Sequence, residues 1–399
     1  MKNCLPAIYL PGTSAENWDR RRREICRLFE THVFGKTPDA ECAVRSQLLH
    51  TEKAFGGKGI REWYEVTLSV ENKSCVLHLA LVLPAADRKA PAVLLICNHD
   101  KTPQAGTPPD KQKMANMLSK APDPWRKQVE SMMARYKNGA PAPVLLDIDT
   151  DQNSEYWPVE DIISRGYAAA AFYASEAQPD DRARFPGALG RLFSETGEQR
   201  PEDDWGALGM WAFAASRMVD VLRGHPRIDS GRISVAGHSR GGKAALWCAA
   251  QDEKVRGVLV NNSGCTGAAV SRGKKGENLA FINAMFPHWF CPRYAEYAWK
   301  EEQLPLDQHM LLACVAPRLC YVTSGTQDAW SDPDAEWEGV KAASQAWNLF
   351  EPTDLPSCPP DAGRPLADHG IGYHRREGGH ALTRWDWMRF LDFLDRHAE

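Results

Sequence analysis

The stretch VAGHSRGGKAALW, residues 235–247, places a serine between two glycines, after an apolar run and before a helix-forming segment. Residues 237–241 read Gly-His-Ser-Arg-Gly and fit the pattern G-x-S-x-G. The preceding RISVAG is typical of a strand, and the following GGKAALWCAAQ is typical of a helix. In a strand–turn–helix setting such a serine is a nucleophile, because the sharp turn holds its hydroxyl exposed. We therefore predict that Ser239 is a catalytic nucleophile; the alternative is a glycine-rich turn with a purely structural role.

Short apolar runs alternate with amphipathic segments along the rest of the chain. The expected strands are 61–70, 76–84, 90–100, 166–174, 232–237, 255–264 and 317–325, and the expected helices are 14–34, 205–224 and 385–397. This alternation predicts an α/β fold with a doubly wound, mostly parallel sheet and helices on both faces. We find no internal repeat or low-complexity linker, which favours a single domain over residues 1–399. Residues 101–160 are polar and proline-rich around a helical middle, and we expect a helical insertion that could cover a cleft.

The composition excludes several classes of function. The net charge is −4, which gives no electrostatic footprint for nucleic acid or an anionic membrane, and no apolar run reaches the roughly 20 residues needed to span a bilayer. The N-terminus has no signal-peptide core, so the chain as given is expected to be cytoplasmic; a chain trimmed of its leader would look the same. Eleven cysteines without CxxC spacing argue against a zinc site. We expect no metal, no cofactor, and a monomer.

A serine nucleophile needs a histidine base. In α/β-hydrolases, the fold that carries this serine motif, the chain order is serine, then acid, then histidine. His380 lies in YHRREGGHALTRWDW, on a glycine-flanked loop just before the last expected helix. We predict that His380 is the base, with His369 and His374 as alternatives.

The base in turn needs a carboxylate that orients it. The segment CYVTSGTQDAW, residues 320–330, is an expected strand that ends at a loop carrying Asp328. We predict that Asp328 is the acid of the triad. Asp332 and Asp334 lie on the same loop and are alternatives, and a helix-capping role is the structural explanation for any of the three.

Six segments keep a common order between residues 205 and 395: GHSRGGKAALW, NNSGCTGAAVSR, GENLAFINAMFPHWF, LPLDQHMLLACVAPR, SGTQDAWSDP and GGHALTRWDW. Together they resemble the glucuronoyl esterases of carbohydrate esterase family 15, which are α/β-hydrolases. The N-terminal FETHVFGKTPD is also similar to this group. The resemblance implies hydrolysis, without a cofactor, of the ester between a glucuronate carboxyl on xylan and a lignin alcohol.

The resemblance also implies roles for single residues. Ser239 matches the nucleophile, His380 the base, and Arg240 an arginine that assists the oxyanion hole. Residues expected to bind the sugar are Lys243, Glu277, Trp330 and Trp289. The structural alternatives are a solvated helix position for Lys243, a surface charge for Glu277 and a core position for Trp330.

The chain departs from the family pattern at three positions. Asn262 stands where many members carry a catalytic glutamate, so the acid role must fall to the loop of Asp328. His238 replaces a cysteine, and Met285 lies about where a substrate-contacting glutamine is expected. The missing glutamine affects the expected glucuronate preference more than the ester chemistry.

The predicted function is a serine carboxylic-ester hydrolase acting on plant-polysaccharide esters, with 4-O-methyl-glucuronoyl esters of lignin alcohols favoured. A second N–H donor to the oxyanion is expected near His99 and Asp100. One alternative is another serine hydrolase, such as an acetyl-xylan-type deacetylase or a peptidase. The other is a non-catalytic carbohydrate-binding relative, which the Asn262 replacement supports.

Overall fold

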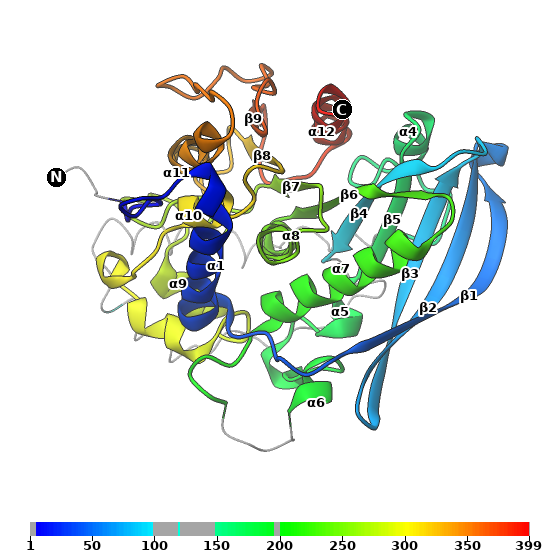
Figure 1. Cartoon of the computed structure of the whole chain (residues 1–399), viewed down its shortest axis with the longest axis horizontal. Helices are drawn as coiled ribbons and strands as arrows, with labels where there is room; N and C mark the ends of the chain where they lie inside the picture. Colours follow the sequence, from blue (N-terminus) through cyan, green and yellow to red (C-terminus); the bar gives the residue numbers. More distant parts are fainter. Residues whose placement is uncertain (1–4, 99–118, 120–147, 195–199, 399) are drawn as a thin grey trace.

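The computed structural model describes residues 5–98, 119, 148–194 and 200–398 (Figure 1). Most of the predicted insertion over 101–160, together with His99 and Asp100, lies outside the described residues. No helix within the described residues has the length and apolar character needed to cross a membrane.

In the described part of the chain the strands form one nine-stranded sheet in the order β1-β2-β3-β5-β4-β6-β7-β8-β9. Three long antiparallel strands make one end: β1 (Ala43–Ala54), β2 (Gly59–Val70) and β3 (Lys73–Pro84). The parallel part contains β4 (Ala90–Cys97), β5 (Ala168–Tyr173), β6 (Ile228–His238), β7 (Gly257–Asn261), β8 (Leu319–Gly325) and β9 (Ile371–Arg376). The central strands are almost wholly apolar because helices bury both of their faces.

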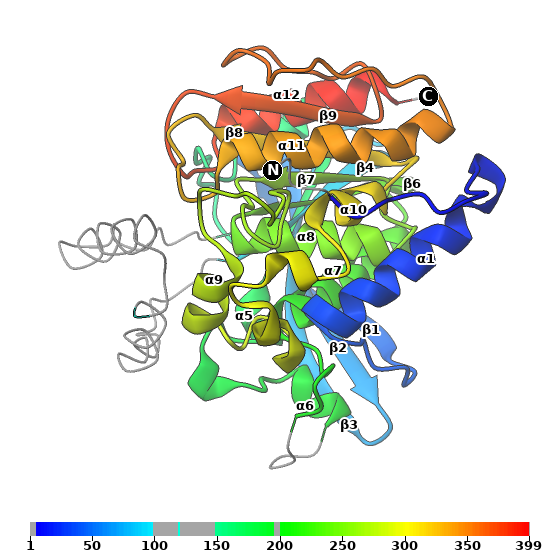
Figure 2. The same cartoon turned by 90° about the vertical axis from the view of Figure 1, so that its left-hand side faces the viewer.

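Helices cover the two faces of the sheet unequally. One core contains α1 (Trp18–Phe29), α7 (Ala207–Gly224), α8 (Arg240–Gln251), α10 (Gln308–Ala313) and α11 (Pro333–Ala343). The opposite core contains α4 (Val159–Ser164) and α12 (Arg384–Arg396). Side chains alternate along β4, since Leu94 and Ile96 enter the first core while Val93 and Leu95 enter the second. In Figure 2 the helices α1, α8 and α10 lie in front of the strands.

The remaining helices of the described ranges are short and lie on the connections. They are η1 (Ala15–Asn17), η2 (Glu30–Phe34), η3 (Phe55–Gly57), α5 (Ala174–Ala177), η4 (Arg182–Arg184), α6 (Gly190–Phe193), α9 (Leu279–Met285), η5 (Pro292–Tyr297), η6 (Glu301–Gln303) and η7 (Ser344–Leu349).

The predicted α/β architecture is confirmed, with differences in detail. The helix expected over 14–34 is divided into η1, α1 and η2, the last of which is a π-helix. The sequence pattern did not indicate β1, β9 or α11. The expected strand over 90–100 ends at Cys97 as β4. Because β4 to β9 run parallel, the loops that follow them gather at one edge, where α/β proteins place their sites.

Candidate active site

The predicted serine turn is a strained elbow between β6 and α8. Ser239 has φ 57° and ψ −124°, a backbone conformation that a residue with a side chain rarely adopts. A Cβ atom on Gly237 would lie 2.1 Å from the Gly241 carbonyl oxygen, so the turn closes only because Gly237 lacks a side chain. The Ser239 N–H donates to the Asn261 carbonyl at 2.9 Å and ties the elbow to β7. The G-x-S-x-G pattern thus follows from the steric demands of this turn.

His380 and Asp328 meet at the same edge of the sheet. His380 Nδ1 lies 2.6 Å from Asp328 Oδ2, on the loops after β9 and β8. The Asp328 carboxylate is buried and also accepts hydrogen bonds from Asn262 Nδ2 at 2.7 Å and from the Ser331 N–H at 3.2 Å. Burial alone would raise the pKa of Asp328, but the hydrogen bond and charge of His380 hold it well below its ordinary value. Asp328 is therefore an ionised partner that can orient the imidazole.

His238 connects the His380–Asp328 pair to the elbow. It directly precedes Ser239, and its ring centroid lies 4.6 Å from that of His380. Its Nδ1 atom lies 2.6 Å from Asn261 Oδ1, and Asn261 Nδ2 donates to Thr323 Oγ1 at 2.6 Å. The position expected to hold a cysteine in relatives thus carries an imidazole that packs beside His380.

The alternative acids have other partners. Asp332 caps α11 through the Ala335 N–H at 3.2 Å, and its second oxygen accepts from the N–H groups of Lys275 and Gly276 at 2.6 and 3.0 Å. Asp334 lies 2.8 Å from Arg375. Asp332 thus has the helix-capping role that was the structural alternative for these aspartates.

The alternative base His374 is also occupied elsewhere. It is fully buried, with its two ring nitrogens 3.0 Å from Tyr321 Oη and 2.8 Å from Asp386 Oδ1. His369 is half-buried on the segment before β9. His380 is thus the one of the three histidines that the structure brings to Asp328.

Arg240, the first residue of α8, lies beside a carboxylate that the sequence analysis missed. Its Nε atom is 2.9 Å from Asp180 Oδ2, on the loop between α5 and η4, and its guanidinium lies 6.0 Å from the Trp289 ring. Asp180 Oδ1 accepts from Trp289 Nε1 at 2.5 Å and lies 3.0 Å from His288 Nε2. Burial would raise the pKa of Asp180, but these partners, Arg240 foremost, lower it to about 2.

Trp289 is 4% exposed and stacks on Phe286 with ring centroids 3.9 Å apart. Its indole contacts Asp180 and Arg240, so it supports the arginine from within the protein. Asp180 follows β5 at the carboxyl edge of the sheet, which is the signal that could have found it in the sequence.

The predicted sugar-binding residues Lys243 and Glu277 are both buried. Lys243 Nζ donates to the Ser263 carbonyl, and burial lowers the pKa of this lysine. Burial raises the pKa of Glu277, while the charges of Lys243 and Lys274 act in the opposite direction. Lys243 is therefore not a solvated helix residue, and Glu277 is not a surface charge. Lys274, which the sequence analysis missed, donates to the Ser331 carbonyl at 2.6 Å.

Trp330 is half-buried two residues after Asp328. Its ring meets that of Phe281 edge-on, with centroids 4.7 Å apart, and Met285 belongs to the same apolar cluster. The Glu277 N–H donates to the Trp330 carbonyl at 2.9 Å, which joins the two predicted sugar contacts. Trp330 is therefore partly exposed, and its backbone is joined to that of the buried Glu277.

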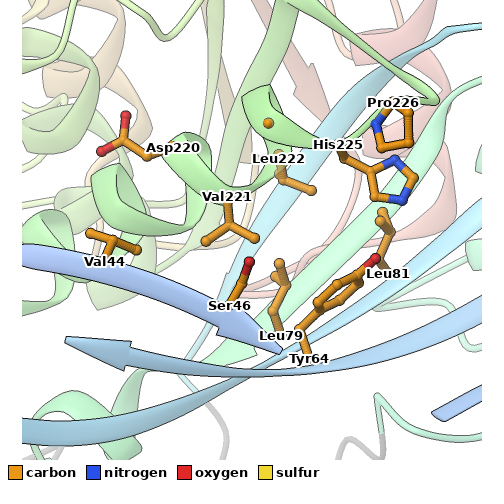
Figure 3. A pocket seen from close by; sticks show the side chains of 11 residues that line it. Val44, Ser46, Tyr64, Leu79, Leu81, Asp220, Val221, Leu222, His225 and Pro226 are labelled. Carbon is orange, nitrogen blue, oxygen red and sulfur yellow. The ribbon is translucent and has the colours of Figure 1, made fainter. Parts of the chain in front are cut away.

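A separate hollow lies at the antiparallel end of the sheet (Figure 3). Its volume is about 350 Å³, and residues of β1, β2, β3 and the end of α7 line it, among them Tyr64 and His225. None of the predicted site residues lines this hollow.

The strained serine elbow and the His380–Asp328 pair, which lie at the same edge of this sheet, are the features of a serine hydrolase of the α/β-hydrolase class. Within the described residues, no group of three or more His, Cys, Asp or Glu side chains could hold a metal ion. The chemistry that this arrangement supports is acyl transfer through a serine ester.

Comparison with known proteins identifies the family. Residues 127–351 match the family described as "Glucuronyl esterase, fungi". A carbohydrate esterase of an unknown prokaryotic organism is 31% identical over 98% of this chain and 88% of its own. The solved glucuronoyl esterase from Solibacter usitatus has a TM-score of 0.82 and 32% identity, covering 100% of this chain and 99% of its own. A 4-O-methyl-glucuronoyl methylesterase of Hypocrea jecorina is 32% identical over 37% of this chain and 34% of its own. The chain belongs to carbohydrate esterase family 15, the glucuronoyl esterases, and it is an enzyme.

Proposed function

We propose that this enzyme hydrolyses 4-O-methyl-glucuronoyl esters that join xylan to lignin alcohols, using Ser239, His380 and Asp328. The observation that carries the proposal is the 2.6 Å contact between His380 Nδ1 and the ionised Asp328. The ring of His380 packs beside His238, which directly precedes the strained Ser239. The curated relatives named 4-O-methyl-glucuronoyl methylesterases support the substrate class.

The reaction proceeds through an acyl-enzyme. Ser239 Oγ attacks the ester carbonyl while His380 takes its proton, and Asp328 holds the imidazole in the required tautomer. The backbone N–H and the guanidinium of Arg240 stabilise the oxyanion; one such donor is typically worth about 3 kcal/mol. His380 then protonates the leaving alcohol and afterwards activates the water that releases the glucuronic acid.

The sugar is held by Lys243, Glu277 and Trp330, with Trp289 acting through Arg240. Glu277 and Lys243 lie in a buried environment, where a hydrogen bond to a sugar hydroxyl is stronger than in water. The partly exposed Trp330 ring offers a flat face to a pyranose. We further propose that residues 1–399 form one domain, that 101–160 is an insertion, and that the enzyme is a monomer without a cofactor.

Comparing hydrolysis of benzyl glucuronate with that of p-nitrophenyl acetate tests the substrate class. We expect the kcat/KM for the glucuronate ester to be the larger by at least tenfold. A preference for the acetate would favour another serine hydrolase. Labelling of the wild-type enzyme by a fluorophosphonate, lost in Ser239→Ala, distinguishes an esterase from a non-catalytic relative.

A further inference from the structure

Asp180 receives contacts from two different parts of the fold. Its Oδ1 atom lies 2.5 Å from Trp289 Nε1 and 3.0 Å from His288 Nε2, on the segment after α9. Its Oδ2 atom lies 2.9 Å from Arg240 Nε, at the start of α8. His288 and Trp289 are buried, so they fix the carboxylate in one orientation. The carboxylate that Arg240 meets is therefore already held in place.

This contact determines which part of Arg240 faces the reaction. A guanidinium carries five N–H donors in a rigid plane. Asp180 engages the Nε side of that plane, and the Arg240 side chain remains 32% exposed. Because this ion pair is formed at Nε, it leaves the two terminal nitrogens of Arg240 for an oxyanion at the neighbouring Ser239. An arginine without this contact would sample many rotamers, at a cost in entropy when it binds an oxyanion.

The same contact also balances charge. Hydrolysis of a uronate ester converts a neutral ester into a carboxylate and an alcohol. A free arginine next to Ser239 would stabilise the oxyanion but would also retain the anionic product. With Asp180 beside it the pair has no net charge, while the directed N–H groups remain.

We propose that Asp180 is a positioning residue that orients the Arg240 guanidinium for the oxyanion and, by neutralising its charge, speeds release of the carboxylate product. This inference rests on the proposed function of Ser239 and Arg240. Asp180 touches no reacting atom and acts through Arg240 alone.

Asp180→Asn is the decisive variant. It keeps the shape of the side chain but has a single acceptor oxygen, which cannot serve both Trp289 and Arg240. We expect kcat for benzyl glucuronate to fall at least tenfold with KM changed less than threefold. We also expect the inhibition constant of free glucuronate to fall at least threefold, because the arginine is no longer neutralised.

Two controls separate this role from a general effect on folding. Glu176→Gln removes a carboxylate of α5 on the same connection, whose partner is His78, and should change neither constant. In an Arg240→Ala background, Asp180→Asn should have no further effect on kcat. A tenfold loss that persists in this background, or unchanged kcat and glucuronate inhibition in the single variant, would overturn the proposal.

The rate of Ser239 labelling by a fluorophosphonate gives a readout that needs no glucuronate. Slower labelling of Asp180→Asn supports the orientation of Arg240 even if the wild type prefers another ester, in which case only the proposed substrate fails. Labelling at the wild-type rate contradicts the orientation, whatever the substrate.

Discussion

At the scale of single residues, Asp328 and Asp332 lie four residues apart on one loop but have different roles. Asp328 contacts His380, whereas Asp332 binds backbone N–H groups of α11 and of residues 275–276. Both are buried acids near a strand end, so residue type alone cannot distinguish them. Their hydrogen-bond partners in the folded protein distinguish them.

We predict that Asp328→Asn lowers kcat by about 10³- to 10⁴-fold, because the amide favours the wrong tautomer of the base. The KM for benzyl glucuronate should change little. Asp334→Asn is the matched control, since this exposed acid pairs with Arg375, and it should keep wild-type kcat. Steady-state kinetics of the two variants checks this, and equal activities would assign the acid elsewhere.

We predict that Glu277→Gln raises the KM for benzyl glucuronate about tenfold while leaving hydrolysis of p-nitrophenyl acetate within twofold. The reason is that a buried carboxylate beside Lys243 recognises sugar hydroxyls that the acetate lacks. Glu338→Gln, on α11, is a control of equal charge change. Parallel losses on both esters would show that Glu277 acts on the fold instead.

At the scale of elements, β6 carries two glycines with different surroundings. A Cβ atom on Gly237 would lie 2.1 Å from a backbone oxygen, whereas at Gly231 the nearest atom is 3.6 Å away. The first is therefore required by the elbow, and the second is not.

Gly237→Ala should lower the free energy of unfolding by about 3 kcal/mol, at the upper end of what overpacking costs, and should abolish activity. Gly231→Ala, on the same strand, should change stability by less than about 1 kcal/mol. Urea denaturation and kcat/KM measurements check both variants. A stable, active Gly237→Ala enzyme is incompatible with the elbow described here.

The elements that the sequence predicted are those with a strong local signal. The buried strands β4 and β5 are nearly continuous apolar runs, and α7 and α12 have a clear amphipathic pattern. Strand β1 was not predicted because its side chains are mostly exposed and lack the alternation of buried and exposed residues that indicates a strand. Asp180 was not predicted as a site residue because its contacts with Arg240 and Trp289 arise only from tertiary packing.

At the scale of the whole molecule, the parallel strands collect the site from widely separated parts of the chain. Asp180, Ser239, Asp328 and His380 follow β5, β6, β8 and β9. Order along the chain therefore predicted the three residues of the proposed triad. Asp180, the partner of Arg240, follows a strand before the serine, where no motif marks it.

Asp180 also links stability to pH. Its pKa in the folded enzyme is about 2, below the ordinary 3.8, so its ionised form stabilises the fold above pH 4. This contribution, about 2 kcal/mol, is lost as the pH falls through 4 toward 2. The difference in unfolding free energy between wild type and Asp180→Asn should therefore shrink over this range. Denaturation at pH 7, 4 and 3 measures it, and a difference independent of pH would contradict the assignment.

If Ser239 is the nucleophile of this glucuronoyl esterase, removing its hydroxyl must remove the reaction, and the activity of Ser239→Ala on benzyl glucuronate measures this. We expect Ser239→Ala to be a folded protein with the wild-type melting temperature and a kcat/KM reduced by about 10⁴-fold or more. A Ser239→Ala enzyme that retains wild-type activity on this ester would contradict it.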